Sequence, residues 1–162
     1  MNRTLWILCL ALSLSFGCAA TRTVRCQSSA AGMVVDAQTG QLLLCRRGRE
    51  VAHYPVSLGR GGLHKRRRGD RKTPVGSYPL GRPRRSRGGF YRFIPVAIPT
   101  RVGTHVGVHG PHRSFRWLGA LNTWFNWTQG CVALGSDAEV DEVVRFVRRH
   151  RVRRIHIVDE RG

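Results

Sequence analysis

The chain has 162 residues and a formal net charge of +19, because it carries 28 lysines and arginines against 9 aspartates and glutamates. This length predicts a single domain. A basic excess of this size is typical of a protein that meets a polyanion, or of one with a solvated basic face. The sequence contains no nucleic-acid recognition motif, which makes DNA or RNA an unfavoured partner.

The first twenty residues have the pattern of a secretory signal peptide. Arg3 is followed by an apolar run over residues 5–16 and then by small residues ending at Ala20. The run is too short and too early for a membrane-spanning helix. A second interpretation is a lipoprotein signal with Cys18 retained and acylated, although Ser15 and Phe16 fit that pattern poorly. Both interpretations place the mature chain in the periplasm or cell envelope, without a transmembrane helix.

After a short polar leader at residues 21–30, the sequence predicts one domain over residues 31–160. Residues 33–36 and 41–45 predict two strands joined by a turn at 37–40, and residues 51–58 predict a third strand. Consecutive hairpins indicate a mostly antiparallel sheet.

Export leaves three cysteines that neither the signal peptide nor a lipid anchor accounts for. Cys26 and Cys45 flank the predicted hairpin. An oxidising compartment favours pairing two of the three and leaving one free. A Cys26–Cys45 disulfide, with Cys131 as the free thiol, fits this arithmetic, but the sequence leaves the pairing open.

Two loops concentrate the positive charge. Residues 59–72 read GRGGLHKRRRGDRK, and this composition predicts a flexible, solvated loop. Asp70 is the only carboxylate between Val51 and Ser136. Residues 81–89 predict a second basic loop, and residues 73–76 predict a turn between the two.

Two further strands are expected over residues 90–99, with a break at Pro95, and over residues 102–109. If residues 102–109 are extended, Gly103, His105, Gly107 and His109 share one face of the strand. An open face of glycines and histidines is typical of a strand that lines a cleft.

Residues 112–127 are unusually aromatic, with Phe115, Trp117, Trp124, Phe125 and Trp127. They form either a local core under a long loop or a lid over the cleft. Further along, Ser136 and Glu139 form a capping box ahead of valines at helical spacing, which predicts a helix. Residues 152–158 predict a closing strand. The predicted architecture is mainly β, with this one amphipathic helix in the C-terminal region.

Cys131 and His109 are the candidate catalytic pair. A thiol becomes a strong nucleophile as thiolate, and a neighbouring imidazole is the usual means of activation. The competing interpretation is a zinc site built from His105, His109, His112 and Cys131. No supporting metal motif accompanies them, so we expect neither metal nor cofactor.

His109-Gly110 followed by Thr128-Gln129-Gly130-Cys131-Val132 resembles the signature of the YkuD-like L,D-transpeptidase family. Residues 54–59 (YPVSLG) and 69–78 (GDRKTPVGSY) resemble the family's entry motifs. The resemblance covers about residues 31–158 and implies a β-sandwich or open barrel.

The resemblance also assigns roles. It implies that Cys131 is the nucleophile, that His109 is a general base held by a backbone carbonyl, and that N–H groups around Gly130 and Cys131 form an oxyanion hole. Thr128 and Gly110 would shape the site. The implied donor is a peptidoglycan stem tetrapeptide, and the acceptor is an amine on another stem or on an envelope protein. Anionic envelope polymers are a possible further partner of the basic surface.

Two positions depart from the family pattern. Gln129 and Ala133 stand where many members have a histidine and an arginine. The carboxylate-binding role of that arginine would then pass to another basic residue, for which Arg101, Arg113 and Arg116 are the candidates. Trp124 and Trp127 are candidates for substrate contact.

Two other functions stay open on the sequence. Water could accept the acyl group, giving an L,D-carboxypeptidase or endopeptidase with the same site. Alternatively, the chain is a non-enzymatic basic module that binds wall polymer or nucleic acid, in which case Cys131 is inert and dispensable.

Overall fold

The computed structural model describes Cys26, residues 30–86 and residues 88–159. The expected signal peptide, Cys18 and most of the leader lie outside the described residues. The elements are β1 Gly32–Asp36, β2 Gln41–Arg46, β3 Arg49–Ser57, β4 Gly76–Pro79, β5 Arg84–Arg85, β6 Arg92–Pro95, β7 Gly107–His109, the 3-10 helix η1 Arg113–Thr123, β8 Val132–Leu134, α1 Asp137–Arg149 and β9 Arg154–Val158.

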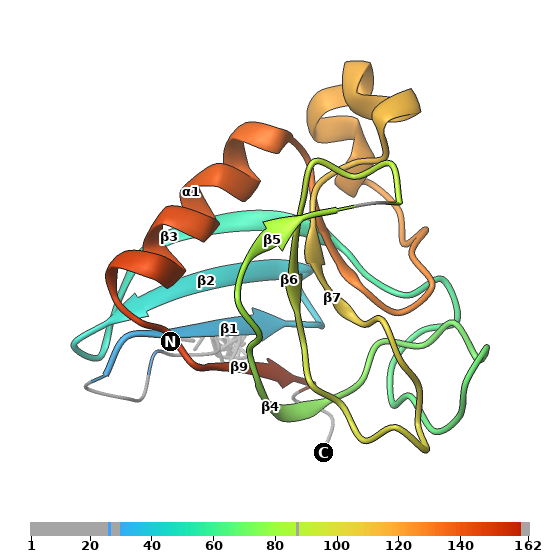
Figure 1. Ribbon diagram of the computed structural model, residues 1–162, viewed down its shortest axis with the longest axis horizontal. Coiled ribbons are helices and arrows are strands. Elements are labelled where there is room, and N and C mark those ends of the chain that lie inside the picture. The colour runs from blue at the N-terminus through green and yellow to red at the C-terminus, as the bar shows by residue number, and fades with distance from the viewer. Residues whose placement is uncertain (1–25, 27–29, 87, 160–162) are drawn as a thin grey trace, which may run out of the picture.

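The strands form one curled, nine-stranded sheet in the order β4-β9-β1-β2-β3-β8-β7-β6-β5 (Figure 1). Two of the pairings, β1 with β9 and β7 with β8, are parallel, and the other pairings are antiparallel. The mainly β class and the antiparallel hairpins predicted from the sequence are confirmed. In β1 the alternation is plain, since Met33 and Val35 are fully buried and Val34 between them is not.

Helix α1 covers the sheet with its valine stripe. Both halves of the capping box are present, because the Ser136 side chain accepts from the Glu139 N–H and the Glu139 side chain accepts from the Ser136 N–H. Val140, Val143 and Val144 are buried. The helix lies against β6 and β8, so it holds the segment that follows Cys131.

The expectation of a strand over residues 102–109 is wrong for its first half. The N–H groups of Val102 and Gly103 donate to the Pro99 carbonyl at 2.9 and 3.3 Å, and His105 has a φ of 64°. These residues form a turn, and only Gly107–His109 is strand. The predicted shared face therefore holds for Gly107 and His109 and fails for Gly103 and His105.

The aromatic insert does not form a local core. Trp117 is 80% exposed and Trp124 78% exposed, and Phe115 and Phe125 are also exposed. Most of the insert is the helix η1, which contacts β3 and β8 and projects away from the body of the molecule in Figure 1. Trp127 behaves differently, because it turns back toward the sheet.

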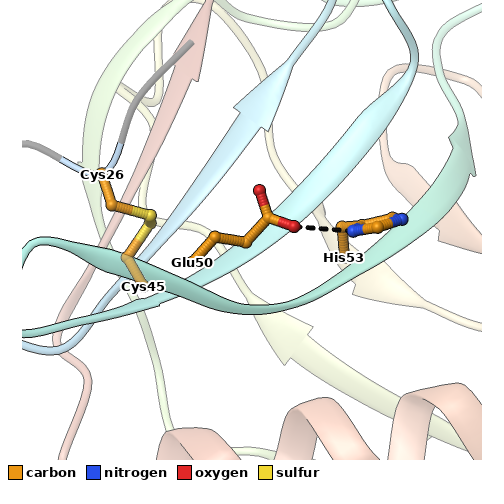
Figure 2. Close-up of a disulfide and its surroundings, with 4 residues drawn as sticks. All are labelled: Cys26, Cys45, Glu50 and His53. Carbon is orange, nitrogen blue, oxygen red and sulfur yellow. Dashed lines mark hydrogen bonds and ion pairs between the residues drawn. A yellow bond between two sulfur atoms is a disulfide. The ribbon is translucent and has the colours of Figure 1, made fainter. Parts of the chain in front are cut away.

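A disulfide joins Cys26 to Cys45 on β2 (Figure 2). The hairpin partner strand carries a hydrogen-bonded pair nearby, with His53 Nδ1 2.6 Å from Glu50 Oε1. Cys131 is the free cysteine of the described chain. Among the described residues, no helix is long and apolar enough to cross a membrane.

Candidate active site

Two neighbouring parallel strands bring Cys131 and His109 together. In the register of β7 with β8, Val108 lies opposite Val132 and His109 opposite Ala133. One residue earlier, Cys131 is therefore opposite Gly107, whose N–H approaches the Cys131 sulfur. Alternate residues of a strand share a face, so the Cys131 and His109 side chains lie diagonally on the same face of the sheet.

The His109 ring is held in one tautomer. Its Nδ1 lies 2.6 Å from the Gly110 carbonyl oxygen, which can only accept, so Nδ1 carries the proton and donates. The Nε2 atom is then left with its lone pair. This is the protonation state that a general base needs.

Aromatic rings enclose the imidazole. The ring centroid of Phe90 is 4.1 Å from that of His109, and those of Trp127 and Phe93 are at 6.0 and 6.1 Å. Burial lowers the pKa of His109 to about 4, against the opposing effect of the hydrogen bond to Gly110. His109 is therefore neutral near pH 7.

Burial also keeps the thiol protonated. It raises the pKa of Cys131 to about 11, while the Gly107 N–H and the charge of Lys65 act in the opposite direction. The Cys131 Sγ also lies 3.5 Å from the His105 carbonyl oxygen, as expected for a thiol donor. Both shifts favour the neutral forms of the two side chains.

Thr128 fixes the turn that carries the cysteine. Its Oγ1 donates to the Cys131 carbonyl at 2.8 Å and accepts from the Gly130 N–H at 3.1 Å. The Gly130 N–H is thus already engaged, which leaves it poorly placed to serve an oxyanion. Gly130 is required for another reason: its φ is 122°, and a Cβ there would lie 2.5 Å from the Lys72 carbonyl oxygen.

Gly110 lets α1 approach the catalytic strand. A Cβ at Gly110 would lie 3.0 Å from both Asp137 Oδ1 and Val140 Cγ2. Its carbonyl is the acceptor for His109. Gly110 therefore shapes the site through its backbone.

Comparison with protein families matches residues 31–157 to the YkuD family, the L,D-transpeptidase catalytic domain. The chain belongs to this family. The comparison with curated sequences returned no significant match.

Solved structures show the same YkuD fold. Pgp2, the helical cell shape determining protein of Campylobacter jejuni, matches with a TM-score of 0.59 at 18% identity, over 80% of this chain and 47% of that one. An L,D-transpeptidase from Mycobacterium smegmatis matches with a TM-score of 0.53 at 15% identity, over 79% and 58%.

L,D-transpeptidase 3 from Mycobacterium tuberculosis, in complex with a faropenem-derived adduct, matches with a TM-score of 0.52 at 16% identity, over 79% and 60%. This chain therefore spans about half to three fifths of the length of these structures. At such identities the likeness establishes the fold.

The candidate arginines differ in their availability to a YkuD substrate. Arg116 Nε pairs with Asp137 Oδ2 at 2.8 Å, so its guanidinium is engaged. Arg113 and Arg101 are exposed. Ala133 is fully buried opposite His109.

The two candidate tryptophans lie in different environments. Trp127 lies against His109, and its Nε1 donates to the Asn122 carbonyl at 2.8 Å. Trp124 is largely exposed and lies outside that ring cluster. Trp127 therefore belongs to the wall of the site.

The histidines of the competing zinc interpretation do not converge. Within the described part of the chain, no three His, Cys, Asp or Glu residues are grouped closely enough to hold a metal ion. His112 instead caps η1, because its side chain accepts from the Ser114 N–H.

Sequence reasoning missed one pair beside the site. Lys65 and Asp70 belong to the loop expected to be solvated, yet their side chains are only 4% and 8% exposed, and Lys65 Nζ lies 2.7 Å from Asp70 Oδ1. The sequence did contain an indication of this pair. A single carboxylate within a run of basic residues is expected to form an ion pair with one of them.

Proposed function

We propose that this chain is an exported, cysteine-dependent L,D-transpeptidase that acts on peptidoglycan stem peptides. The observation that carries the proposal is the placement of Cys131 and His109 on one face of adjacent strands, with the Nδ1 proton of His109 committed to the Gly110 carbonyl. Membership of the YkuD family supplies the reaction class.

Acylation begins with the thiol still protonated. Nε2 of His109 takes the thiol proton as the Cys131 sulfur attacks the carbonyl carbon of the L-to-D peptide bond in the donor tetrapeptide. The carbonyl electrons move to oxygen, forming a tetrahedral oxyanion. Collapse re-forms the carbonyl and breaks the C–N bond, and the imidazolium gives its proton to the departing amine. A thioester on Cys131 remains.

Transfer repeats the sequence with an acceptor amine. His109 removes a proton from the amine as its nitrogen attacks the thioester carbon. The C–S bond then breaks and the sulfur recovers its proton from the imidazolium. If water takes the place of the amine, the same steps give an L,D-carboxypeptidase or endopeptidase.

The Cys131 N–H is our candidate oxyanion donor. The adjacent Gly130 N–H donates to Thr128 Oγ1 and stabilises the turn instead. We assign Thr128 and Gly110 to shaping the site, and Trp127 to one wall of the substrate cleft. Arg101 and Arg113 are the candidates for binding a substrate carboxylate.

The working compartment that we propose is the periplasm or cell envelope, reached through the signal at residues 1–20, with a lipid anchor at Cys18 as the alternative form. The +19 charge suits contact with anionic envelope polymers. Pgp2 is a cell shape determining protein, and a similar role is proposed here for this chain.

The test is intact mass spectrometry of the mature protein after brief incubation with a carbapenem, beside Cys131→Ala. We expect one stoichiometric adduct that the variant lacks. A folded, reduced protein that takes no adduct would overturn the proposal and favour the basic binding module. Incubation with tetrapeptide, with and without an acceptor amine, then separates transfer from hydrolysis.

A further inference from the structure

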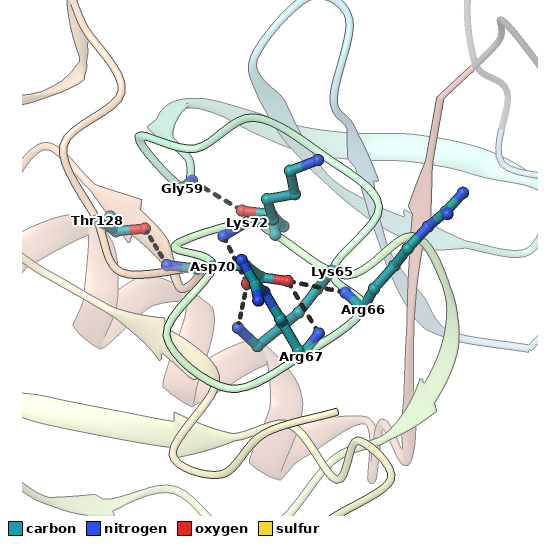
Figure 3. Close-up of polar contacts among 9 residues, drawn as sticks. Gly59, Lys65, Arg66, Arg67, Asp70, Lys72 and Thr128 are labelled. Carbon is teal, nitrogen blue, oxygen red and sulfur yellow. Dashed lines mark hydrogen bonds and ion pairs between the residues drawn. The ribbon is translucent and has the colours of Figure 1, made fainter. Parts of the chain in front are cut away.

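A buried ion pair lies in the loop at residues 59–73. Asp70 Oδ1 accepts from Lys65 Nζ at 2.7 Å and from the Lys72 N–H at 3.1 Å, and Oδ2 accepts from the Arg66 and Arg67 N–H groups at 2.8 and 3.0 Å (Figure 3). The carboxylate has four donors. Burial would raise the pKa of Asp70, but these hydrogen bonds outweigh it and hold the pKa well below its usual range.

This loop packs directly on the turn that carries the nucleophile. Gly59 and Thr128 form a parallel bridge, and the Arg60 N–H donates to the Thr128 carbonyl at 2.9 Å. The Lys72 carbonyl fills the space beside Gly130. The loop and the reactive turn therefore form one packed unit.

Lys65 extends from this loop toward the reactive turn. Its Nζ lies 3.9 Å from the position that a Cβ would occupy on Gly130, next to Cys131, and 3.7 Å from the corresponding position on Gly103. A Cβ on Gly103 would lie 2.7 Å from Lys65 Cε, so a side chain there would crowd the lysine. Gly103 therefore leaves room for Lys65.

Burying a lysine is costly, and a buried ion pair is weak evidence of stabilisation. The loop contains several other bases that stay in water, such as Arg66 and Arg67. Lys65 differs from these bases because its side chain is buried beside the turn that carries Cys131. This placement indicates that its positive charge has a function.

We propose that Lys65 is a positioning residue for the nucleophile: Asp70 and the loop backbone hold its ammonium beside the Gly130–Cys131 turn, where it stabilises the negative charge that develops on sulfur. The inference rests on the proposed role of Cys131 as nucleophile. It supplies a fixed positive charge for the thiolate that forms during attack.

The titratable and charged groups around the thiol come from three elements. His109 is on β7, and His105 is in the preceding turn and presents its carbonyl to the sulfur at 3.5 Å. The 59–73 loop adds Lys65 and its partner Asp70. Burial raises the pKa of Cys131, and Lys65 is the charged group that opposes this effect.

The test measures the rate of iodoacetamide alkylation of Cys131 against pH, in the mature protein with its disulfide intact and with Cys131→Ala as the blank. Lys65→Met keeps the length of the side chain and removes its charge. We expect the midpoint of the profile to rise and alkylation at pH 8 to slow by about tenfold. Lys65→Arg should restore most of the rate.

The direction in which Asp70→Asn shifts the midpoint of the alkylation profile distinguishes an electrostatic role of Lys65 from a structural one. Removing the carboxylate leaves the Lys65 charge unbalanced, so the midpoint should fall below that of the wild type. A purely structural pair would shift both variants in the same direction, because either substitution would loosen the same loop. Thermal unfolding of each variant measures that loosening separately.

A midpoint unchanged in Lys65→Met, or raised in both variants, would overturn the proposal. If Lys65→Met does not fold, Asp70→Asn decides alone, and an unchanged or raised midpoint there overturns it. Alkylation requires no acyl transfer. Failure of this proposal is therefore distinguishable from failure of carbapenem acylation, which tests the proposed function.

Discussion

Thr128 and Cys131 are joined by a hydrogen bond that closes the reactive turn. The Thr128 hydroxyl donates to the Cys131 carbonyl at 2.8 Å while it accepts the Gly130 N–H at 3.1 Å. A single buried hydroxyl thus fixes the peptide unit before Gly130 and the peptide unit after Cys131. The position of the nucleophile depends on this side chain, although Thr128 itself takes no part in the bond changes proposed above.

Replacing Thr128 by valine should therefore impair both stability and reactivity. Valine has a similar shape and no hydroxyl, so two backbone groups lose their partner. We expect the free energy of unfolding to fall by about 1–3 kcal/mol. Carbapenem acylation should slow by about tenfold or more, because the sulfur is misplaced.

Thr128→Ser is the matched control, since it keeps the hydroxyl and should retain most of both properties. The measurements are urea unfolding and the rate of adduct formation by mass spectrometry. Acylation of Thr128→Val at the wild-type rate would contradict the role given to this hydrogen bond.

Gly130→Ala should damage the same turn through sterics. The residue has a φ of 122°, and its Cβ would lie 2.5 Å from the backbone oxygen of Lys72. Backbone atoms cannot move aside as a flexible side chain can. We expect a loss of about 2–4 kcal/mol in the free energy of unfolding, from backbone strain together with overpacking.

Gly119→Ala separates these two causes. Gly119 also has positive φ, 52°, but a Cβ there meets nothing within 4 Å. With ψ at −128°, Gly119 lies outside the left-handed helical region, and backbone strain alone should cost about 1–3 kcal/mol. Equal losses in the two variants, measured by urea unfolding, would show that the contact with Lys72 is unimportant.

The sequence was informative wherever a pattern was local. The capping box at Ser136 and Glu139 predicts where α1 begins, because both of its hydrogen bonds lie within one turn. The hairpin of β1 and β2 follows from alternation and a short turn. The motif around Cys131 indicated which thiol and which imidazole to examine.

Long-range packing accounts for what the sequence did not reveal. The Lys65 side chain lies against the turn at Gly103, where a Cβ would clash with it, and Gly103 is far from Lys65 along the chain. Similarly, the residues around His105 turn where alternation predicted a strand. Composition classed the loop at 59–72 as solvated because composition cannot show which one of many bases is folded inward.

The disulfide should stabilise the fold without affecting the reactive site. Cys26 and Cys45 are 19 residues apart in sequence, and reduction should lower the free energy of unfolding by about 3 kcal/mol. Cys45 is at the end of β2 that pairs with Glu50, whereas the other end of β3 pairs with β8. Carbapenem acylation of Cys131 should therefore keep its rate in the reduced, folded protein.

Urea unfolding with and without a reducing agent measures the first effect. The paired variant Cys26→Ser with Cys45→Ser serves as a control that cannot re-form the bond. A large fall in acylation rate at a temperature where this variant stays folded would show that the two regions are coupled.

The reactivity of the site should survive mild acid. The proposed base must be neutral, and the pKa of His109 is lowered to about 4. Adduct formation should therefore show no loss centred near pH 6.5 that is due to the imidazole, and a loss of this kind should appear only as the pH falls toward 4. An inflection near 6.5 in the acylation rate would mean that His109 is solvated in the reacting enzyme.

The same burial makes stability depend on pH. His109 is 2% exposed, and its folded pKa of about 4 lies below the unfolded value of 6.5. The unfolded chain then binds more protons between these values, so stability is fully present above pH 6.5 and is lost as the pH falls through 4. The shift corresponds to about 3 kcal/mol.

Urea unfolding from pH 7 to pH 4 measures the loss, and His109→Gln should lack this part of it because glutamine does not titrate. An equal loss in the variant and the wild type would assign the acid sensitivity to groups other than His109.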